Sequence, residues 1–180
     1  MDIISNTKDK HNYGILMIEQ PPSKRIINVI NDRNLEVKVT TGSYFLSIPN
    51  IIFKIYYKEI KENDETIICF KGIKICFFVE NQCYVPPFLN MIRSGEVCLG
   101  KGEIKKETLE KLTKECIKKW WGTFNTDLAH AFHLYKNKEL SNYKEWEKKT
   151  KENPEWIPDS SYFVKMYEDD SKTFLSKTYF

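Results

Sequence analysis

The feature that most constrains this chain is a series of short strand-like segments that fills its first half. Each segment is rich in β-branched and aromatic residues, and several alternate apolar with polar positions. In chain order the segments cover residues 13–19, 25–30, 35–39, 51–60, 66–70 and 73–79. Turn-forming runs such as QPPSK, NDRN and KENDE separate them, and no helical pattern intervenes. Because strands joined by tight turns pair with one another, the first half predicts an antiparallel β-meander.

Two of these segments predict a single hairpin. The run ETIICFKGIKICFFVE has strand character on both sides of Lys71 and Gly72. A Lys-Gly pair between two apolar runs is typical of a tight turn. We therefore expect the chain to reverse at these two residues.

The pattern changes from strands to helices after Gly102. The run EIKKETLEKLTKECIKKWW repeats apolar residues every three or four positions, with acidic residues near its start and lysines near its end. FNTDLAHAFHLYKNKEL and SNYKEWEKKTKENPEWIP predict a second and a third helix, the third ending at Pro154. Segregated strands and helices define the α+β class, here with the C-terminal helices packed on one face of the antiparallel sheet.

Length and composition predict one globular domain. The chain has 180 residues, of which 41% are hydrophobic, and we expect a single domain over 1–180. Its core is expected at 12–140, with a helical or irregular extension at 141–180. The 28 basic and 25 acidic residues are interspersed, so no basic stripe indicates nucleic acid. The polar start MDIISNTKDKHN does not resemble a signal peptide and no segment is long and apolar enough for a bilayer, so a cytoplasmic protein without a membrane partner is expected.

The five cysteines predict reduced thiols rather than a disulfide framework. They are odd in number and no close pair is spaced like zinc ligands. Cys69 and Cys76 are expected to be small buried side chains of strands. Cys83, in ENQCYVPP, is expected to be partly exposed and to lack a supporting group. Cys98 stands apart, because it lies in a glycine-containing loop between the strands and the helices.

The segment FLNMIRSGEVCLGKG, residues 88–102, is the best candidate for a functional site. Its glycines permit an irregular loop that exposes the Cys98 thiol, and Arg93 and Lys101 bring the positive charge that favours a thiolate. Asn90, eight residues before the cysteine, carries an amide that can stabilise an oxyanion. The residues alone leave two interpretations open, a buried small hydrophobic side chain or a nucleophile that the loop presents.

The same segment resembles the active-site sequence of the ubiquitin-conjugating enzymes. That family has a His-Pro-Asn triplet and then Gly-x-[Ile/Val]-Cys-Leu, with the asparagine eight residues before the cysteine. GEVCL at 95–99 matches the second half, and Asn90 stands at the matching distance from Cys98. The chain is similar to the prokaryotic family D of these proteins, which includes the PRTRC system protein B group and has a comparable aromatic-rich segment, here WWGTFNTDLAH. Phe88 and Leu89 replace the His-Pro of the triplet.

The resemblance implies a ubiquitin-conjugating-enzyme-like fold and a two-step acyl transfer. Cys98 would accept a ubiquitin-like protein as a thioester from a ThiF-type activating enzyme and pass it to an amine. Asn90 would stabilise the oxyanion of the tetrahedral intermediate. No metal or organic cofactor is implied. A JAB-type peptidase is a further expected member of the same bacterial pathway.

Two alternatives to the acyl carrier remain. A relative without catalysis would keep the fold and act as a binding scaffold for a ubiquitin-like protein. A thiol hydrolase would instead pair Cys98 with His130, oriented by Asp127 or Asn125.

Two further patterns have simpler interpretations. His130 and His133 are spaced like paired metal ligands on a helix, but too few other ligands exist and solvated histidines are favoured. Trp120, Trp121 and Phe124 suggest an aromatic binding platform, although aromatic residues at helical spacing more often pack in a core.

Overall fold

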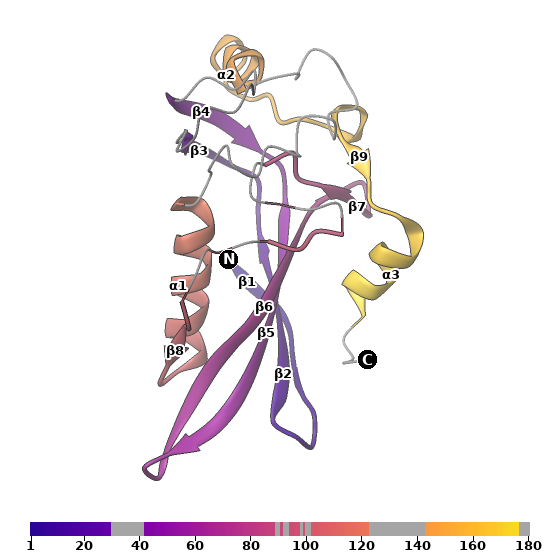
Figure 1. Cartoon of the computed structure of the whole chain (residues 1–180). Helices are drawn as coiled ribbons and strands as arrows, with labels where there is room; N and C mark the ends of the chain where they lie inside the picture. The colour runs from indigo at the N-terminus through magenta and orange to yellow at the C-terminus, as the bar shows by residue number, and fades with distance from the viewer. Residues whose placement is uncertain are drawn as a thin grey trace.

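The structure is a computed structural model that describes residues 1–29, 42–88, 91, 94–97, 99, 102–122 and 143–176 (Figure 1). The strands are β1 (Asp2–Lys8), β2 (Tyr13–Gln20), β3 (Ser23–Val29), β4 (Gly42–Ile48), β5 (Ile51–Glu62), β6 (Glu65–Val79), β7 (Gln82–Val85), β8 (Lys105–Lys106) and β9 (Val164–Lys165). The helices are α1 (Leu109–Gly122), α2 (Tyr143–Glu152) and α3 (Glu168–Leu175), with a 3₁₀ turn at Ser160–Tyr162.

The predicted antiparallel meander is present, but a separate hairpin interrupts it. The main sheet has the strand order β1-β2-β5-β6-β7-β9, and β8 pairs with β6. β2 pairs directly with β5, whereas β3 and β4 form a two-stranded sheet of their own. Figure 1 shows this smaller sheet beside α2, at the end of the molecule opposite the tip of the β5–β6 hairpin.

The predicted hairpin at Lys71 and Gly72 is wrong, because β6 runs without a break through both residues. The chain reverses earlier, at Asn63 and Asp64, whose φ angles are 51° and 65°. Asn and Asp tolerate this left-handed conformation better than most residues, and a two-residue turn that needs it matches the twist of the flanking strands.

The Lys-Gly pair marks a β-bulge instead of a turn. Tyr56 is opposite Gly72 in the register, but the next residue, Tyr57, is opposite Phe70. Lys71 is therefore an extra residue on β6, which locally increases the twist of the strand pair. A glycine at such a position suits a bulge as well as a turn, and only the pairing with β5 distinguishes the two.

Five strands were not predicted from the sequence: β1, β4, β7, β8 and β9. β8 lies inside the run predicted as the first helix, which begins only at Leu109. β1 reads DIISNTK and is mostly exposed, as expected of an edge strand with little apolar pattern. β7 and β9 are too short to show a period. The strand predicted at 35–39 and the helix predicted from FNTDLAHAFHLYKNKEL lie outside the described residues.

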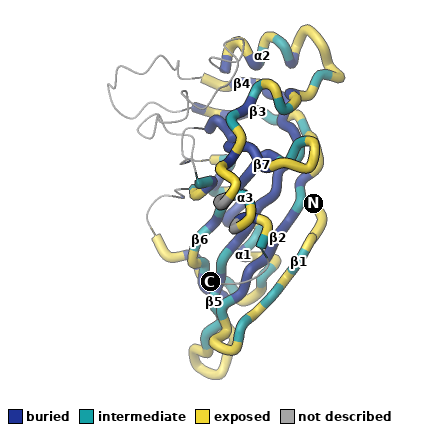
Figure 2. Tube along the Cα trace, turned by 90° about the vertical axis from the view of Figure 1, so that its right-hand side faces the viewer, coloured by how far each residue is buried: buried dark blue, intermediate teal, exposed yellow. Residues whose placement is uncertain are grey.

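The sheet is buried on both faces, by different helices. Alternate residues Phe53, Ile55 and Tyr57 of β5 face the larger core cluster, which also contains buried side chains of α1 and α2. Ile52 points the other way, into a smaller cluster that includes Phe174 of α3. Figure 2 shows buried stretches in β5 and β6, an exposed hairpin tip, and α3 lying in front of the sheet. The expectation that the C-terminal helices share one face is therefore wrong for α3.

The composition of β5 explains this second covered face. Its first half, IIFKIYY, is apolar at nearly every position instead of alternating, which is the pattern of a strand covered on both sides. Within the described parts of the chain, no helix is long and apolar enough to cross a membrane.

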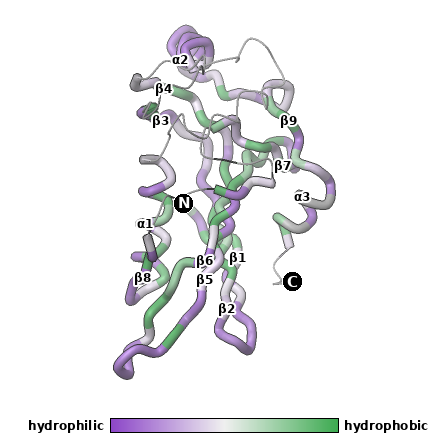
Figure 3. Tube along the Cα trace, in the orientation of Figure 1, coloured by the Kyte–Doolittle hydropathy of each residue, from purple (hydrophilic) through white to green (hydrophobic). Residues whose placement is uncertain are grey.

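The three- and four-residue spacing that predicts the first helix matches the buried side of α1. Leu112, Cys116, Ile117 and Trp120 are the buried residues of α1, so the core interpretation of Trp120 is confirmed. Trp121 packs against the same cluster and is partly buried. The third predicted helix is α2, which ends just before Pro154. Figure 3 shows α2 as one of the most hydrophilic segments, because only one side of it faces the core.

Candidate functional site

The two predicted site residues, Asn90 and Cys98, lie outside the described residues. The same holds for other residues singled out in the sequence: Leu89, Arg93, Lys101, Phe124, Asn125, Asp127, His130 and His133. The described neighbours of Asn90 and Cys98 nevertheless define how this part of the chain is attached to the sheet.

The chain that returns from β7 follows one edge of β6. β7 pairs with residues 77–79, and residues 95–97 lie opposite residues 73–75. Further along, the Phe70 N–H donates to the Ile104 carbonyl at 2.9 Å, and β8 pairs with β6 just beyond. The candidate segment is thus held against the sheet on both sides of Cys98 in the sequence.

The GEV part of the motif forms a short β-contact with β6. The Ile75 N–H donates to the carbonyl of Gly95 at 2.8 Å, and the Val97 N–H donates to the carbonyl of Ile73 at 3.2 Å. Gly95 has a φ of 82°, which side chains rarely adopt. A Cβ there would also lie 2.8 Å from the Ile75 carbonyl oxygen, so the contact requires glycine.

A bridge joins the two halves of the motif. Met91 and Val97 pair as an isolated antiparallel bridge, and Met91 is only 2% exposed. Leu99 is also buried, at 8%. Met91, which follows Asn90, and Val97 and Leu99, on either side of Cys98 in the sequence, therefore pack against the core.

Phe88, where the ubiquitin-conjugating enzymes have histidine, is an aromatic anchor. It is fully buried, and its ring stacks on Trp146 at 6.0 Å between centroids. It meets Phe77 at 5.7 Å and Trp120 at 5.6 Å in edge-on geometry. The sequence alone gave no reason to expect this role, because Trp146 lies far along the chain.

Charged groups surround a hollow beside the GEV segment. The hollow has a volume of about 400 Å³ and is lined by Tyr56, Lys71, Gly72, Lys74, Glu96 and Val97, among others. Lys74 and Glu96 form an ion pair at 3.5 Å between nitrogen and oxygen. Burial, together with the charge of Glu96, raises the pKa of Tyr56 to about 12, so its hydroxyl stays protonated at neutral pH.

A buried lysine, Lys54, lies on the same face of β5 as Tyr56, two residues away. Lys54 is 1% exposed, and its Nζ donates to the carbonyl of Ser176, just after α3, at 2.7 Å. Burial, and secondarily the charge of Lys74, lowers the pKa of Lys54 to about 8. This ammonium thus binds the C-terminal end of α3, where the helix dipole is negative.

The described cysteines are all buried, as predicted for Cys69 and Cys76. The prediction for Cys83 is wrong on both points. Cys83 is 1% exposed, and its Sγ lies 3.5 Å from that of Cys76. The error follows from the unpredicted elements, since β7 carries Cys83 and α3 covers it. Among the described residues, no group of three or more His, Cys, Asp or Glu side chains is placed to hold a metal ion.

A comparison with known protein families supports the resemblance stated from the sequence. The model of prokaryotic E2 family D matches residues 10–162 of the chain. This range includes the main-sheet strands β2 and β5–β7, both halves of the motif, and α1 and α2. No curated protein and no solved structure matches the chain.

Proposed function

Since the chain belongs to prokaryotic E2 family D, we propose that it carries a ubiquitin-like protein as a thioester on Cys98 and passes it to an amine. Membership in the family supports a ubiquitin-conjugating-like role in general, with a ubiquitin-like protein and an activating enzyme as partners. The observation that carries the finer proposal is the family match itself, because its range contains both Cys98 and Asn90.

In the first step, the Cys98 thiolate attacks the carbonyl carbon of the thioester that a ThiF-type activating enzyme holds. The enzyme's thiolate leaves and a new thioester forms on Cys98. In the second step, an amine attacks the same carbonyl carbon, and the Asn90 amide donates a hydrogen bond to the oxyanion. The Cys98 thiolate leaves, the nitrogen loses a proton, and an amide bond remains.

The attachment of the motif supports this pairing of residues. Asn90 precedes Met91 and Cys98 follows Val97, and Met91 and Val97 are bridged. Consecutive Cα atoms are about 3.8 Å apart, so the bridge limits how far the proposed donor and nucleophile can separate. The eight-residue spacing in the sequence is therefore compatible with one site.

The aromatic anchor supports the proposal despite the missing His-Pro pair. Phe88 packs among core aromatic side chains and begins the motif, and the bridge at Met91 follows three residues later. Where the family has a histidine, this chain thus has a buried ring that attaches the start of the motif to the core.

The test is reconstitution with the ThiF-like enzyme and ubiquitin-like protein from the same bacterium, with ATP, followed by non-reducing gels. We expect an adduct that thiols remove, that is lost in Cys98→Ala and that becomes a reductant-resistant oxyester in Cys98→Ser. Cys116→Ala, which alters a buried thiol of α1, is the matched control and should still load. A JAB-type peptidase of the same pathway is a proposed further partner.

The scaffold alternative predicts a different result in the same assay. A scaffold would bind the ubiquitin-like protein without any covalent adduct, and Cys98→Ala would bind equally well.

If loading is seen, Asn90→Ala should slow discharge to free lysine more than it slows loading. Equal slowing of both steps would show that Asn90 does not act on the oxyanion.

A further inference from the structure

Two buried thiols face one another beneath α3. Cys76 lies on β6 and Cys83 on β7, with their Sγ atoms 3.5 Å apart. Phe78 is directly opposite Cys83 in the antiparallel register, so the two cysteines are diagonal neighbours on one face of the sheet. Both belong to the smaller core cluster.

The pair is asymmetric in a way that prepares one sulfur for attack. The Cys76 thiol donates its hydrogen bond to the Cys83 sulfur, and this lowers the pKa of Cys83. Burial raises the pKa of Cys76. A disulfide requires an S–S distance of about 2.05 Å, so the two sulfurs need to approach by only about 1.5 Å.

The cover over this pair is a short helix. α3 has eight residues, Glu168–Leu175. Phe174 of α3 is fully buried in the same cluster as the thiols, and Lys54 binds the carbonyl of Ser176, which follows the helix. A helix this short depends on packing for its stability, so α3 is an element that can open locally.

We propose that Cys76 and Cys83 form a redox-active dithiol whose access α3 controls, and that a low-molecular-weight disulfide of the glutathione type oxidises it. The Cys83 thiolate attacks one sulfur of the oxidant, and the first glutathione thiolate leaves. The Cys76 thiolate then attacks the Cys83 sulfur and releases the second glutathione. Two protein thiols are oxidised to one disulfide, one oxidant disulfide is reduced to two thiols, and the two protein protons end on glutathione.

The two cysteines lie next to residues that hold the candidate site in place. This proximity does not depend on whether Cys98 carries an acyl group. Cys76 directly follows Ile75, whose N–H holds the Gly95 carbonyl. On the other strand, the Met166 N–H donates to the Cys83 carbonyl at 3.0 Å, and the Met166 methyl lies 3.0 Å from the position that a Cβ of residue 95 would take. The disulfide would therefore form among the residues that fix the GEV segment.

The experiment incubates the full chain, as wild type and as Cys98→Ser, with millimolar oxidised glutathione. The sample is then denatured, alkylated with N-ethylmaleimide and mapped by mass spectrometry. We expect a Cys76–Cys83 cross-link that dithiothreitol reverses and that Cys83→Ser abolishes. Cys116→Ser, on the opposite face, is the control and should leave the rate unchanged within about twofold.

The role of α3 is tested with two substitutions on the helix. Phe174→Ala should speed cross-linking by at least about tenfold, because loss of the buried ring weakens docking. Leu175→Ala, at a residue that is 41% exposed, should change the rate by less than about twofold. Native-state labelling of the wild type by N-ethylmaleimide measures access without any variant that risks unfolding.

Two outcomes overturn the proposal. If N-ethylmaleimide reaches Cys83 in the native wild type but glutathione disulfide yields no Cys76–Cys83 cross-link, the pair is not redox-active. If neither reagent reaches Cys83 over days, the pair is sealed and purely structural. Both results are independent of whether Cys98 carries an acyl group.

Discussion

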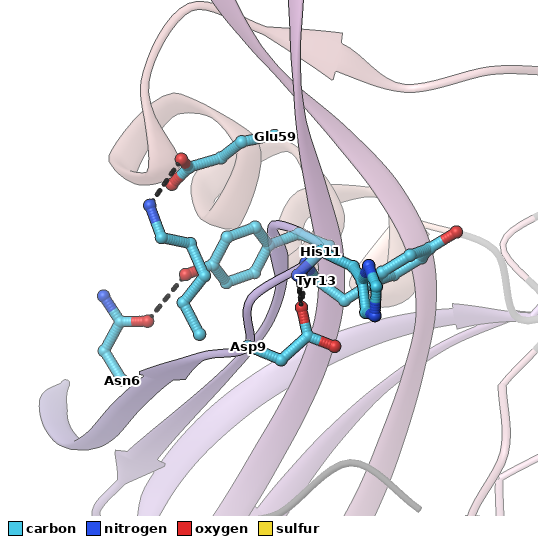
Figure 4. A network of polar contacts seen from close by, with 7 residues as sticks. Asn6, Asp9, His11, Tyr13 and Glu59 are labelled. Atoms are coloured by element: carbon cyan, nitrogen blue, oxygen red, sulfur yellow. Dashed lines mark hydrogen bonds and ion pairs between the residues drawn. The ribbon is translucent and has the colours of Figure 1, made fainter.

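The ring of Tyr57 fills the space in which a side chain of residue 14 would begin. A Cβ added to Gly14 would lie 2.0 Å from Cζ of Tyr57. The ring is held at this same end, because the Tyr57 hydroxyl donates to Oδ1 of Asn6 at 2.8 Å. Figure 4 labels Asn6 and marks its hydrogen bond with a dashed line. Three adjacent strands, β1, β2 and β5, thus meet in one contact that only glycine permits.

We expect Gly14→Ala to destabilise the fold by about 2 kcal/mol or more, because the ring cannot move without losing its hydrogen bond and its packing. Urea unfolding monitored by fluorescence measures the loss. Gly72→Ala is the matched control, since a Cβ there would make only an ordinary contact of 3.7 Å with Tyr56. Equal destabilisation by both substitutions would contradict the steric explanation.

Restoring the family histidine at position 88 should weaken this protein. Phe88→His places an imidazole among Phe77, Trp120 and Trp146, and we expect a loss of about 3 kcal/mol, with less for Phe88→Leu. The folded-state pKa of that imidazole would be depressed, so the loss should grow as pH falls below about 6.5, where the unfolded chain binds the proton. Urea titrations at pH 8 and pH 5 test this. An equal loss at both values would show that the imidazole is not buried.

Lys54 should make stability depend on pH in the alkaline range. Its pKa is about 8 in the folded protein against an ordinary 10.5. Between these values the unfolded chain holds more protons than the folded one, so this lysine's contribution to the free energy of unfolding rises with pH. Above about pH 10 the contribution of Tyr56 falls with pH, because its pKa is raised from 10.0 to about 12 in the folded protein.

The measurement is therefore the difference between wild type and Lys54→Met at each pH. We expect the variant to be relatively more stable at pH 7 than at pH 10, because it has no buried ammonium to desolvate. Lys61→Met, at an exposed position of β5, is the control and should show no such trend. A difference that stays constant from pH 7 to pH 10 would exclude a lowered pKa for Lys54.

Local patterns correctly predicted elements that bury only one of their sides. The helical spacing of Leu112, Cys116 and Trp120 identified the inner face of α1, because that face alone meets the core. The same reasoning failed for β6, where Lys71 and Gly72 have the composition of a turn and only pairing with β5 shows a bulge. Long-range pairing, not propensity, decides such positions.

The motif was identified by resemblance, but its surroundings could not be predicted. GEVCL and Asn90 were identified by their similarity to the ubiquitin-conjugating enzymes, whereas the anchoring of Phe88 depends on Trp146, nearly sixty residues away. The contact of Cys83 with Cys76 likewise required β7 and α3, which have no clear sequence period. Sequence patterns indicate local structure, whereas these contacts depend on the tertiary fold.

The glycine of GEVCL offers the sharpest test of how the motif is held. Gly95 and Gly102 both have positive φ, of 82° and 118°, so alanine strains the backbone at either site. They differ in space, because a Cβ at 95 would meet the Ile75 carbonyl and the Met166 methyl, whereas nothing lies within 4 Å of a Cβ at 102. We expect Gly102→Ala to lose about 1 kcal/mol and Gly95→Ala a further 1–3 kcal/mol, approximately.

Hydrogen exchange then shows whether the loss at Gly95 acts through the β-contact. The amide of Ile75 donates to the Gly95 carbonyl, and that of Val97 donates to Ile73. Both amides should exchange faster in Gly95→Ala by at least about tenfold, while Gly102→Ala leaves them close to wild type, because only the first substitution forces the GEV segment off β6. If both variants raise exchange equally, position 95 requires glycine because of backbone strain and not because of the steric fit against β6.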